Sequence, residues 1–141
     1  MKLSTKARYG LRAFIDVAVY GDEGPISLAS IAARQGISAD YLEKLMGKLR
    51  GAGLVESVRG AAGGYVLTRD VDEYSVGEVL RALEGELIPV DCRKDGKSGC
   101  SGTRKCLSHI VWQQINESLN ATVDAINIGA LIRANSQRNE V

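Results

Sequence analysis

The chain of 141 residues has little histidine, cysteine or aromatic side chain: one histidine, three cysteines and 5% aromatic residues. None of its apolar runs approaches the roughly 18 residues that a membrane-spanning helix needs, so we expect no membrane segment. The start, MKLSTKARYG, is polar and basic, which argues against a secretory signal. We therefore expect a cytoplasmic protein, where an odd number of cysteines argues against a disulfide framework.

Composition and length fit a soluble globular domain, or one domain with an added dimerisation element. Hydrophobic residues make up 45% and charged residues 25% of the chain. The net charge of +1 hides an uneven distribution, because residues 1–70 hold 10 Lys and Arg against 7 Asp and Glu, while residues 71–141 hold 8 against 10. A basic first half permits nucleic-acid binding without demonstrating it.

Serine caps and apolar periodicity predict three helices before the first strand. Ser4, Ser27 and Ser38 each precede a segment whose apolar residues recur at helical spacing. The second helix is short and ends at Gly36, and the third ends near Gly51.

Two β-rich runs, residues 54–58 and 65–68, surround a glycine-rich turn and predict a β-hairpin. Ser75 caps a fourth helix. Neither proline nor glycine occurs from Thr103 to Ile126, and apolar residues recur there every three or four positions, which predicts a long amphipathic helix. A short helical segment, GALIRA, can follow. The predicted fold is mostly α with a small β-hairpin.

Residues 27–55 have the pattern of a helix-turn-helix, with a short helix, a glycine turn and a capped second helix. The polar face of that second helix can enter a DNA major groove about 12 Å wide. Its expected DNA-binding residues are Ser38, Asp40, Tyr41, Glu43, Lys44 and Lys48. Taken alone, this pattern also fits a helix pair whose polar face is only solvated.

The hairpin favours DNA binding, because a β-wing directly after such a helix makes a winged helix-turn-helix. Arg59, which precedes the glycine-rich tip, suits insertion into a narrow and strongly negative minor groove. We expect this DNA-binding domain to span residues 1–85.

All three cysteines and the histidine lie in one glycine-rich stretch, at Cys92, Cys100, Cys106 and His109. Thiolates suit zinc, copper(I) or iron-sulfur centres, and imidazole suits iron and zinc. The surrounding basic residues favour a 2Fe-2S cluster, which three thiolates and a neutral imidazole would leave with about one negative charge. A structural zinc site remains open on these donors, although zinc sites more often contain C-x2-C pairs.

A thiol enzyme with Cys106 as nucleophile and His109 as base is a further alternative. The sequence speaks against it, because a glycine-rich loop preorganises catalytic groups poorly and no oxyanion-type motif is apparent. We therefore expect no enzyme.

Four stretches carry a family resemblance: LSTKARYGLRAF, ISADYLEKLMGKLRGAGLVESVRGAAGGY, SVGEVLRALEG and the loop ending in CLSH. Through them the chain resembles, over nearly its whole length, the iron-sulfur cluster regulators of the Rrf family of winged helix-turn-helix transcription factors. The resemblance implies a homodimer joined through the long helix, and operator contacts from the third helix and the wing. It also implies a 2Fe-2S cluster held by Cys92, Cys100, Cys106 and His109.

The resemblance also implies roles for single residues, and the sequence departs from the family pattern at a few positions. The glutamate matching Glu43 helps to discriminate operators by cluster state, and the arginine matching Arg59 reaches the minor groove. The seven-residue gap between the first two cysteines, with Asp40 and Lys44 in the third helix, departs from the best-known relatives, so the operator sequence is not carried over. His109 favours the sensing of cluster homeostasis over the sensing of nitric oxide, because nitric-oxide-sensing members of the family lack this ligand. A further alternative within the family is thiol redox sensing without a cluster.

The expected organisation has four parts. They are a DNA-binding domain at 1–85, a cluster-binding loop at 86–106, a dimerisation helix at 107–135 and a flexible tail at 136–141. We expect cluster ligation to order the loop, and a difference in operator affinity between the two states to act as the switch.

Overall fold

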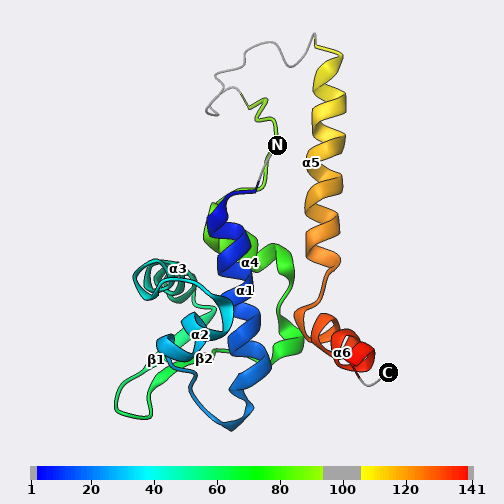
Figure 1. Ribbon diagram of the computed structural model, residues 1–141. Coiled ribbons are helices and arrows are strands. Elements are labelled where there is room, and N and C mark those ends of the chain that lie inside the picture. The colour runs from blue at the N-terminus through cyan, green and yellow to red at the C-terminus, as the bar shows by residue number, and fades with distance from the viewer. Residues whose placement is uncertain (1–2, 94–105, 140–141) are drawn as a thin grey trace.

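The computed structural model describes residues 3–93 and 106–139. Helices α1 to α4 and a hairpin form a compact head, and α5 and α6 stand beside it (Figure 1). In chain order the elements are α1 (Thr5–Tyr20), η1 (Gly21–Glu23), α2 (Leu28–Gln35), α3 (Ala39–Gly51), β1 (Val55–Val58), β2 (Gly64–Leu67), η2 (Val71–Glu73), α4 (Val76–Glu84), α5 (Ser108–Ala125) and α6 (Ile128–Asn139). The predicted fold, mostly helical with one small hairpin in a winged helix-turn-helix, is confirmed.

Serine side chains begin the helices of the head as predicted. Ser4, Ser27, Ser38 and Ser75 each accept a hydrogen bond from a backbone amide in the first turn. These bonds satisfy amides that have no partner inside the helix. Gly36 ends α2 at φ +63, a left-handed conformation that glycine adopts without strain.

The hairpin lies against the segment that precedes α2. Strands β1 and β2 are antiparallel, with Val55 opposite Leu67. Ile26 and Tyr65 exchange two backbone hydrogen bonds of 3.0 and 2.8 Å. A Cβ atom on Gly64 would lie 2.2 Å from the Ile26 carbonyl oxygen, so only glycine allows this close approach.

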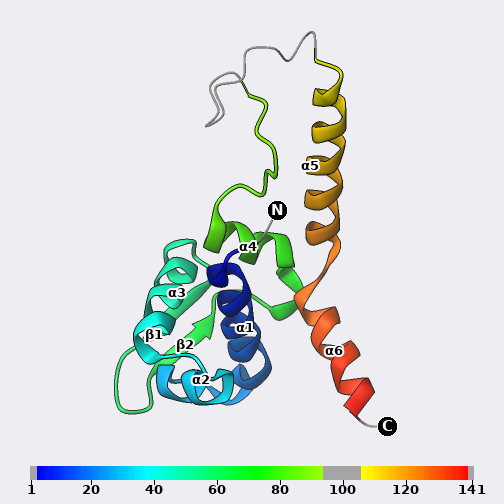
Figure 2. The same ribbon diagram turned by 45° about the horizontal axis from the view of Figure 1, so that its top comes forward.

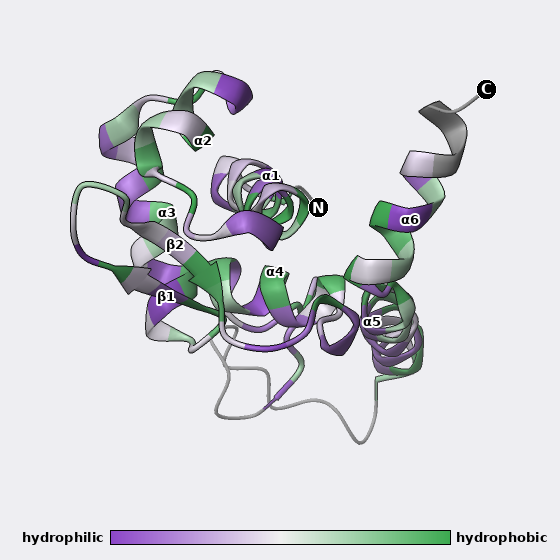
Figure 3. Ribbon diagram, turned by 90° about the horizontal axis from the view of Figure 1, so that it is seen from below, coloured by the Kyte–Doolittle hydropathy of each residue, from purple (hydrophilic) through white to green (hydrophobic). Residues whose placement is uncertain are grey.

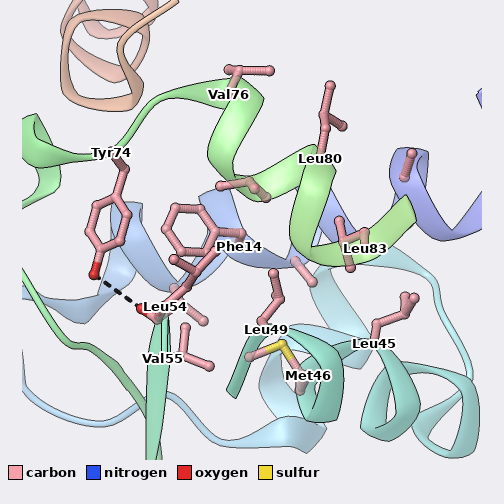
Figure 4. Packing of buried hydrophobic residues seen from close by; sticks show 14 of the residues in the cluster. Phe14, Leu45, Met46, Leu49, Leu54, Val55, Tyr74, Val76, Leu80 and Leu83 are labelled. Atoms are coloured by element: carbon pink, nitrogen blue, oxygen red, sulfur yellow. Dashed lines mark hydrogen bonds between the residues drawn. The ribbon is translucent and has the colours of Figure 1, made fainter. Parts of the chain in front are cut away.

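The hydrophobic core lies between α1, α3 and α4 (Figure 4). The Phe14 ring on α1 meets the Tyr74 ring edge-to-face, with centroids 5.0 Å apart. A Cβ atom on Gly10 would lie 2.5 Å from the Leu83 side chain, so this α4 side chain packs directly against the backbone of α1. The core therefore fixes the position of α3, whose inner face joins it.

A buried carboxylate fixes α2 on α1. Asp16 is only 2% exposed, and it accepts hydrogen bonds from Arg34 Nε at 2.9 Å and Gln35 Nε2 at 2.8 Å. A second guanidinium nitrogen of Arg34 lies 2.6 Å from the carboxylate. Because a charge buried in this way requires such partners, the arrangement holds the first helix of the helix-turn-helix in place.

Tyr74 connects the hairpin to the arm. Its hydroxyl donates to the Leu54 carbonyl at 3.0 Å, drawn as a dashed line in Figure 4, and accepts from the amides of Thr68 and Arg69 at 3.0 and 2.9 Å. Its backbone carbonyl accepts from the Ile128 amide at 3.0 Å. One residue therefore supports both the base of the wing and the start of α6.

Helices α5 and α6 form an arm attached to the head near the junction between them (Figure 2). The Val76 amide donates to the Ile126 carbonyl at 2.9 Å, and Arg81 forms an ion pair with Asp124 at 2.7 Å. Figure 3 shows hydrophobic positions in green on both helices of the arm. The N-terminal end of α5 points away from the head.

The arm contains two helices, whereas the expected dimerisation helix, residues 107–135, is one. Helix α5 begins at Ser108, so Cys106 precedes it, contrary to the expected start near Thr103. The predicted end of the long helix near Ile126 is confirmed, because this residue is extended and the GALIRA segment lies in a separate helix of 12 residues. The break arises because the Asn127 side chain accepts the Ala130 amide and caps α6.

Among residues 3–93 and 106–139, no helix is both long and apolar enough to cross a membrane. Residues 94–105, which include Cys100 and the middle of the predicted cluster-binding loop, lie outside the described residues.

We expect Tyr74→Phe to lower the free energy of unfolding by about 1–3 kcal/mol, because it removes the hydrogen bonds of the Tyr74 hydroxyl to the backbone of Leu54, Thr68 and Arg69 at the base of the wing. Urea unfolding measures the change. Tyr20→Phe is the matched control, since this tyrosine is 52% exposed, and its effect should stay within about 0.5 kcal/mol. Equal effects of the two substitutions would contradict the role given to the Tyr74 hydroxyl.

Candidate nucleic-acid interface and metal centre

Helix α3 presents the polar face that the sequence predicts. The side chains of Glu43, Lys44 and Lys48 are exposed, and Asp40 lies exposed in the first turn. The opposite side of the helix is buried in the core. The exposed face carries both charges, which suits base reading, because lysine can donate to guanine and a carboxylate can accept from cytosine.

Two of the predicted DNA-binding residues also have structural roles. Ser38 caps α3 by accepting the Tyr41 amide at 3.3 Å. Tyr41 is half-buried: its ring meets the Tyr9 ring edge-to-face at 6.2 Å, and its hydroxyl donates to Thr5 at 3.2 Å. Tyr41 therefore holds α3 against α1 and offers DNA only part of its side chain.

Arg59 lies exposed directly after β1, where the hairpin turns. Gly60 follows at φ +116, and a Cβ atom on Gly63 would lie 2.1 Å from the Val58 carbonyl oxygen. The turn is thus a narrow backbone loop with an arginine at its base. Such a shape fits the narrow minor groove, which attracts arginine.

A cavity of about 330 Å³ lies between α5 and the segment that follows α4. Both Cys92 and His109 line this cavity. The Nδ1 atom of His109 is buried and has no hydrogen-bond partner among the residues that the structure describes. A thiol and an imidazole that line one cavity are a donor set that fits iron or zinc.

Of the other two predicted ligands, Cys106 is not among the described residues that line this cavity. Cys106 is exposed, with its sulfur 2.9 Å from the Ser108 hydroxyl oxygen. Hydrogen bonds from the Ser108 hydroxyl and the His109 backbone amide lower the pKa of the Cys106 thiol, which favours the ligating thiolate. Cys100 lies outside the described residues, and within 3–93 and 106–139 no group of three His, Cys, Asp or Glu side chains is placed to hold a metal ion.

Sequence reasoning did not single out two asparagines of α5, of which Asn116 lines the cavity. Asn116 and Asn120 lie one turn apart on α5, and their side-chain amides donate to the carbonyls of Val90 and Leu87 at 3.0 and 2.8 Å. The available signal was a pair of asparagines spaced by four residues within an amphipathic helix. That spacing alone does not distinguish an inner polar stripe from a solvated one.

Helix α5 also carries an exposed apolar row at its N-terminal end. Leu107 is 83% and Ile110 is 61% exposed, and Val111 and Ile115 continue the row. Large exposed apolar residues that lie together mark an interaction surface.

Solved structures of similar fold and curated relatives point to one family. The T. potens IscR structure has a TM-score of 0.77 and 40% identity, and it covers 95% of this chain and 88% of that chain. The structure of CymR (YrzC), the global cysteine regulator of B. subtilis, has a TM-score of 0.77 and 39% identity, covering 95% of this chain and 98% of that chain.

Among curated proteins, the HTH-type transcriptional regulator IscR of Aliivibrio salmonicida is 46% identical over 132 residues, which are 94% of this chain and 77% of the relative. IscR of Klebsiella pneumoniae is 44% identical over the same length, or 80% of that relative. The resemblance inferred from the sequence is therefore confirmed. A family model described as Rrf2, iron-dependent transcriptional regulator, matches residues 3–134, and the chain belongs to the Rrf2 family of DNA-binding transcriptional regulators.

Proposed function

We propose that this regulator senses iron-sulfur cluster status through a 2Fe-2S cluster bound by Cys92, Cys100, Cys106 and His109. The observation that carries the proposal is the cavity shared by Cys92 and His109, where His109 Nδ1 lacks a hydrogen-bond partner in the described part of the chain. Similarity to IscR proteins over 94% of this chain supports the same assignment.

A bound cluster would supply a redox-active centre whose presence depends on iron and sulfide supply. The chain's own residues perform the remaining tasks. Cys106 is biased towards the thiolate by its neighbours, and His109 offers a nitrogen without another partner among the described residues. Control of transcription then requires only that the loaded and empty forms differ in operator affinity, since a ligand shifts an equilibrium by its differential affinity for two states.

The DNA-binding role is assigned to α3 and the wing. Glu43 and Lys44 on α3 would face base edges in the major groove, and Arg59 would enter the minor groove. We assign the exposed apolar row of α5 to a homodimer, whose two-fold symmetry would present two α3 helices to two operator half-sites.

Other signals compatible with these donors are rivals to the proposal. The equal TM-scores to an IscR and to a cysteine regulator mean that the fold does not choose between cluster sensing and another signal. Nitric oxide sensing, thiol redox sensing and zinc binding without sensing therefore remain to be separated by experiment. For a thiol enzyme, the observed contact of the Cys106 sulfur is with Ser108, whereas the His109 imidazole lines the cavity, which is a poor arrangement for a nucleophile and its base.

Anaerobic purification followed by absorption spectroscopy and iron and sulfide analysis tests the cofactor. We expect visible absorption with iron and labile sulfide in equal amounts, and loss of both in Cys92→Ala and Cys106→Ala. Operator affinity should differ between loaded and empty wild-type protein and should no longer respond to loading in the variants. Colourless protein with stoichiometric zinc would favour the zinc rival, and unchanged affinity at every operator would remove the switch.

We expect Arg59→Ala to weaken operator binding by about 1–3 kcal/mol, because the arginine loses its contacts in the minor groove. Fluorescence anisotropy on a labelled operator measures the change. Arg133→Ala is the control: it removes the same charge from α6, where the residue is paired with Asp72 at 2.7 Å. An undiminished affinity of the Arg59 variant would contradict the assignment of the wing.

Gly47 allows stability and DNA binding to be separated. It lies in α3 on the exposed face, and a Cβ atom there would have nothing within 4 Å. Gly47→Ala should raise the free energy of unfolding by about 0.5–1 kcal/mol, because alanine is the better helix former, yet it should weaken operator binding by placing a methyl group against the groove. A gain in stability with unchanged operator affinity would show that DNA does not approach α3 at this turn.

A further inference from the structure

The segment that carries Cys92 is fastened to α5 through its backbone. Asn116 Nδ2 donates to the Val90 carbonyl at 3.0 Å, and Asn120 Nδ2 donates to the Leu87 carbonyl at 2.8 Å. The later residue of α5 holds the earlier residue of the segment, so the segment runs antiparallel to the helix. Because hydrogen bonds to the backbone fix position along a chain, these two bonds set the register between the segment and α5.

This register has a consequence for the predicted ligands. Cys92 follows Val90 by two residues in the direction that leads along α5 towards His109, and both Cys92 and His109 line the same cavity. A shift of the segment along α5 would carry Cys92 away from its present place at the cavity. The asparagine bonds thus determine whether the thiol and the imidazole share a cavity.

Asn120 is hydrogen-bonded to the head. Arg81 on α4 donates to Asn120 Oδ1 at 2.7 Å and to both carboxylate oxygens of Asp124 at 2.7 and 2.9 Å. A Cβ atom on Gly77 would lie 2.1 Å from Asp124 Oδ1, so glycine at this position is needed for the approach. The bonded series from α4 through Asn120 to the segment is therefore continuous.

In Asn116 the side-chain nitrogen has a hydrogen-bond partner, but the side-chain oxygen has none among the described residues. Asn116 Oδ1 is buried and has no hydrogen-bond partner among the described residues, and Asn116 lines the cavity that Cys92 and His109 share. Among these residues, His109 Nδ1 is the other buried side-chain atom in the same condition. A buried acceptor without a partner costs about 1–3 kcal/mol. Both residues that carry these atoms line the same cavity.

We propose that Asn116 is a positioning residue for the metal centre: its side-chain amide holds the segment at Val90 so that Cys92 lines the same cavity as His109. Asn120 and Arg81 anchor the same segment to α4. The role of Asn116 in metal binding rests on the proposed function. The position of Cys92 does not depend on a bound cluster, so it can be tested in the metal-free chain.

Asn116→Asp is the sharpest change, because it keeps the size of the side chain and replaces the amide donor with a second acceptor facing the Val90 carbonyl. Gln113→Glu is the matched control. Gln113 lines the same cavity, but its amide donates to Glu117 at 3.1 Å and not to the segment. The control therefore adds the same charge to the lining of the same cavity, but it leaves the hydrogen bonds between α5 and the segment unchanged.

The test uses the reduced, metal-free full chain under anaerobic conditions. Iodoacetamide labelling followed by peptide mass spectrometry gives the rates of alkylation at Cys92 and Cys106 in one sample. In the wild type the half-buried Cys92 should react more slowly than the exposed Cys106. Asn116→Asp should raise the ratio of the Cys92 rate to the Cys106 rate about fivefold to tenfold, because it releases the segment that carries Cys92. Gln113→Glu should leave this ratio unchanged.

Because a general loss of stability would expose both cysteines, Cys106 is an internal reference, and Asn116→Ala gives a second, uncharged variant with the same expected rise. An unchanged ratio in both Asn116 variants overturns the proposal, even if wild-type protein takes up a cluster. A raised ratio in both supports it, even if reconstitution with iron and sulfide yields no cluster, in which case the proposed function alone fails. Where a cluster forms, its absorption should decay faster in Asn116→Asp than in Gln113→Glu on addition of a chelator.

Discussion

Tyr74 lies where three parts of the molecule meet. Its ring packs against Phe14 in the core, its hydroxyl binds the base of the wing, and its carbonyl accepts the Ile128 amide at the start of α6. A buried tyrosine needs partners for its hydroxyl, so the wing cannot move away from the core without breaking these bonds. The wing and the arm therefore share one support.

The two ends of α5 face different environments. Its C-terminal half packs on α4 and buries Val123, whereas its N-terminal half turns a polar stripe towards its own cavity and leaves Leu107 and Ile110 open. In an ordinary amphipathic helix the apolar side faces the protein's own core. In α5 the N-terminal half instead lines the cavity with polar side chains, among them His109, Gln113 and Asn116, and leaves its apolar residues exposed.

Local signals in the sequence were sufficient for the head. Ser38 and Gly36 act on their own neighbours, so their effect on helix ends can be read without knowing the fold. The arm was harder to predict. Asn127 interrupts the helix by capping the next one, and Asn116 binds a carbonyl 26 residues away in a segment without periodic pattern. Of the four predicted ligands, the structure brings two to one cavity, and the complete set stays a prediction.

The cavity and the junction with the head lie at opposite ends of α5, whose 18 residues span about 27 Å. Over that length, a displacement of about 2 Å at the N-terminal end of α5 corresponds to a tilt of only about 4° at its C-terminal end. The junction of the arm with the head lies beside Tyr74, whose carbonyl accepts the Ile128 amide. In the proposed homodimer, such a tilt would change the spacing of the two α3 helices, and DNA half-sites of fixed helical phasing would then fit better or worse.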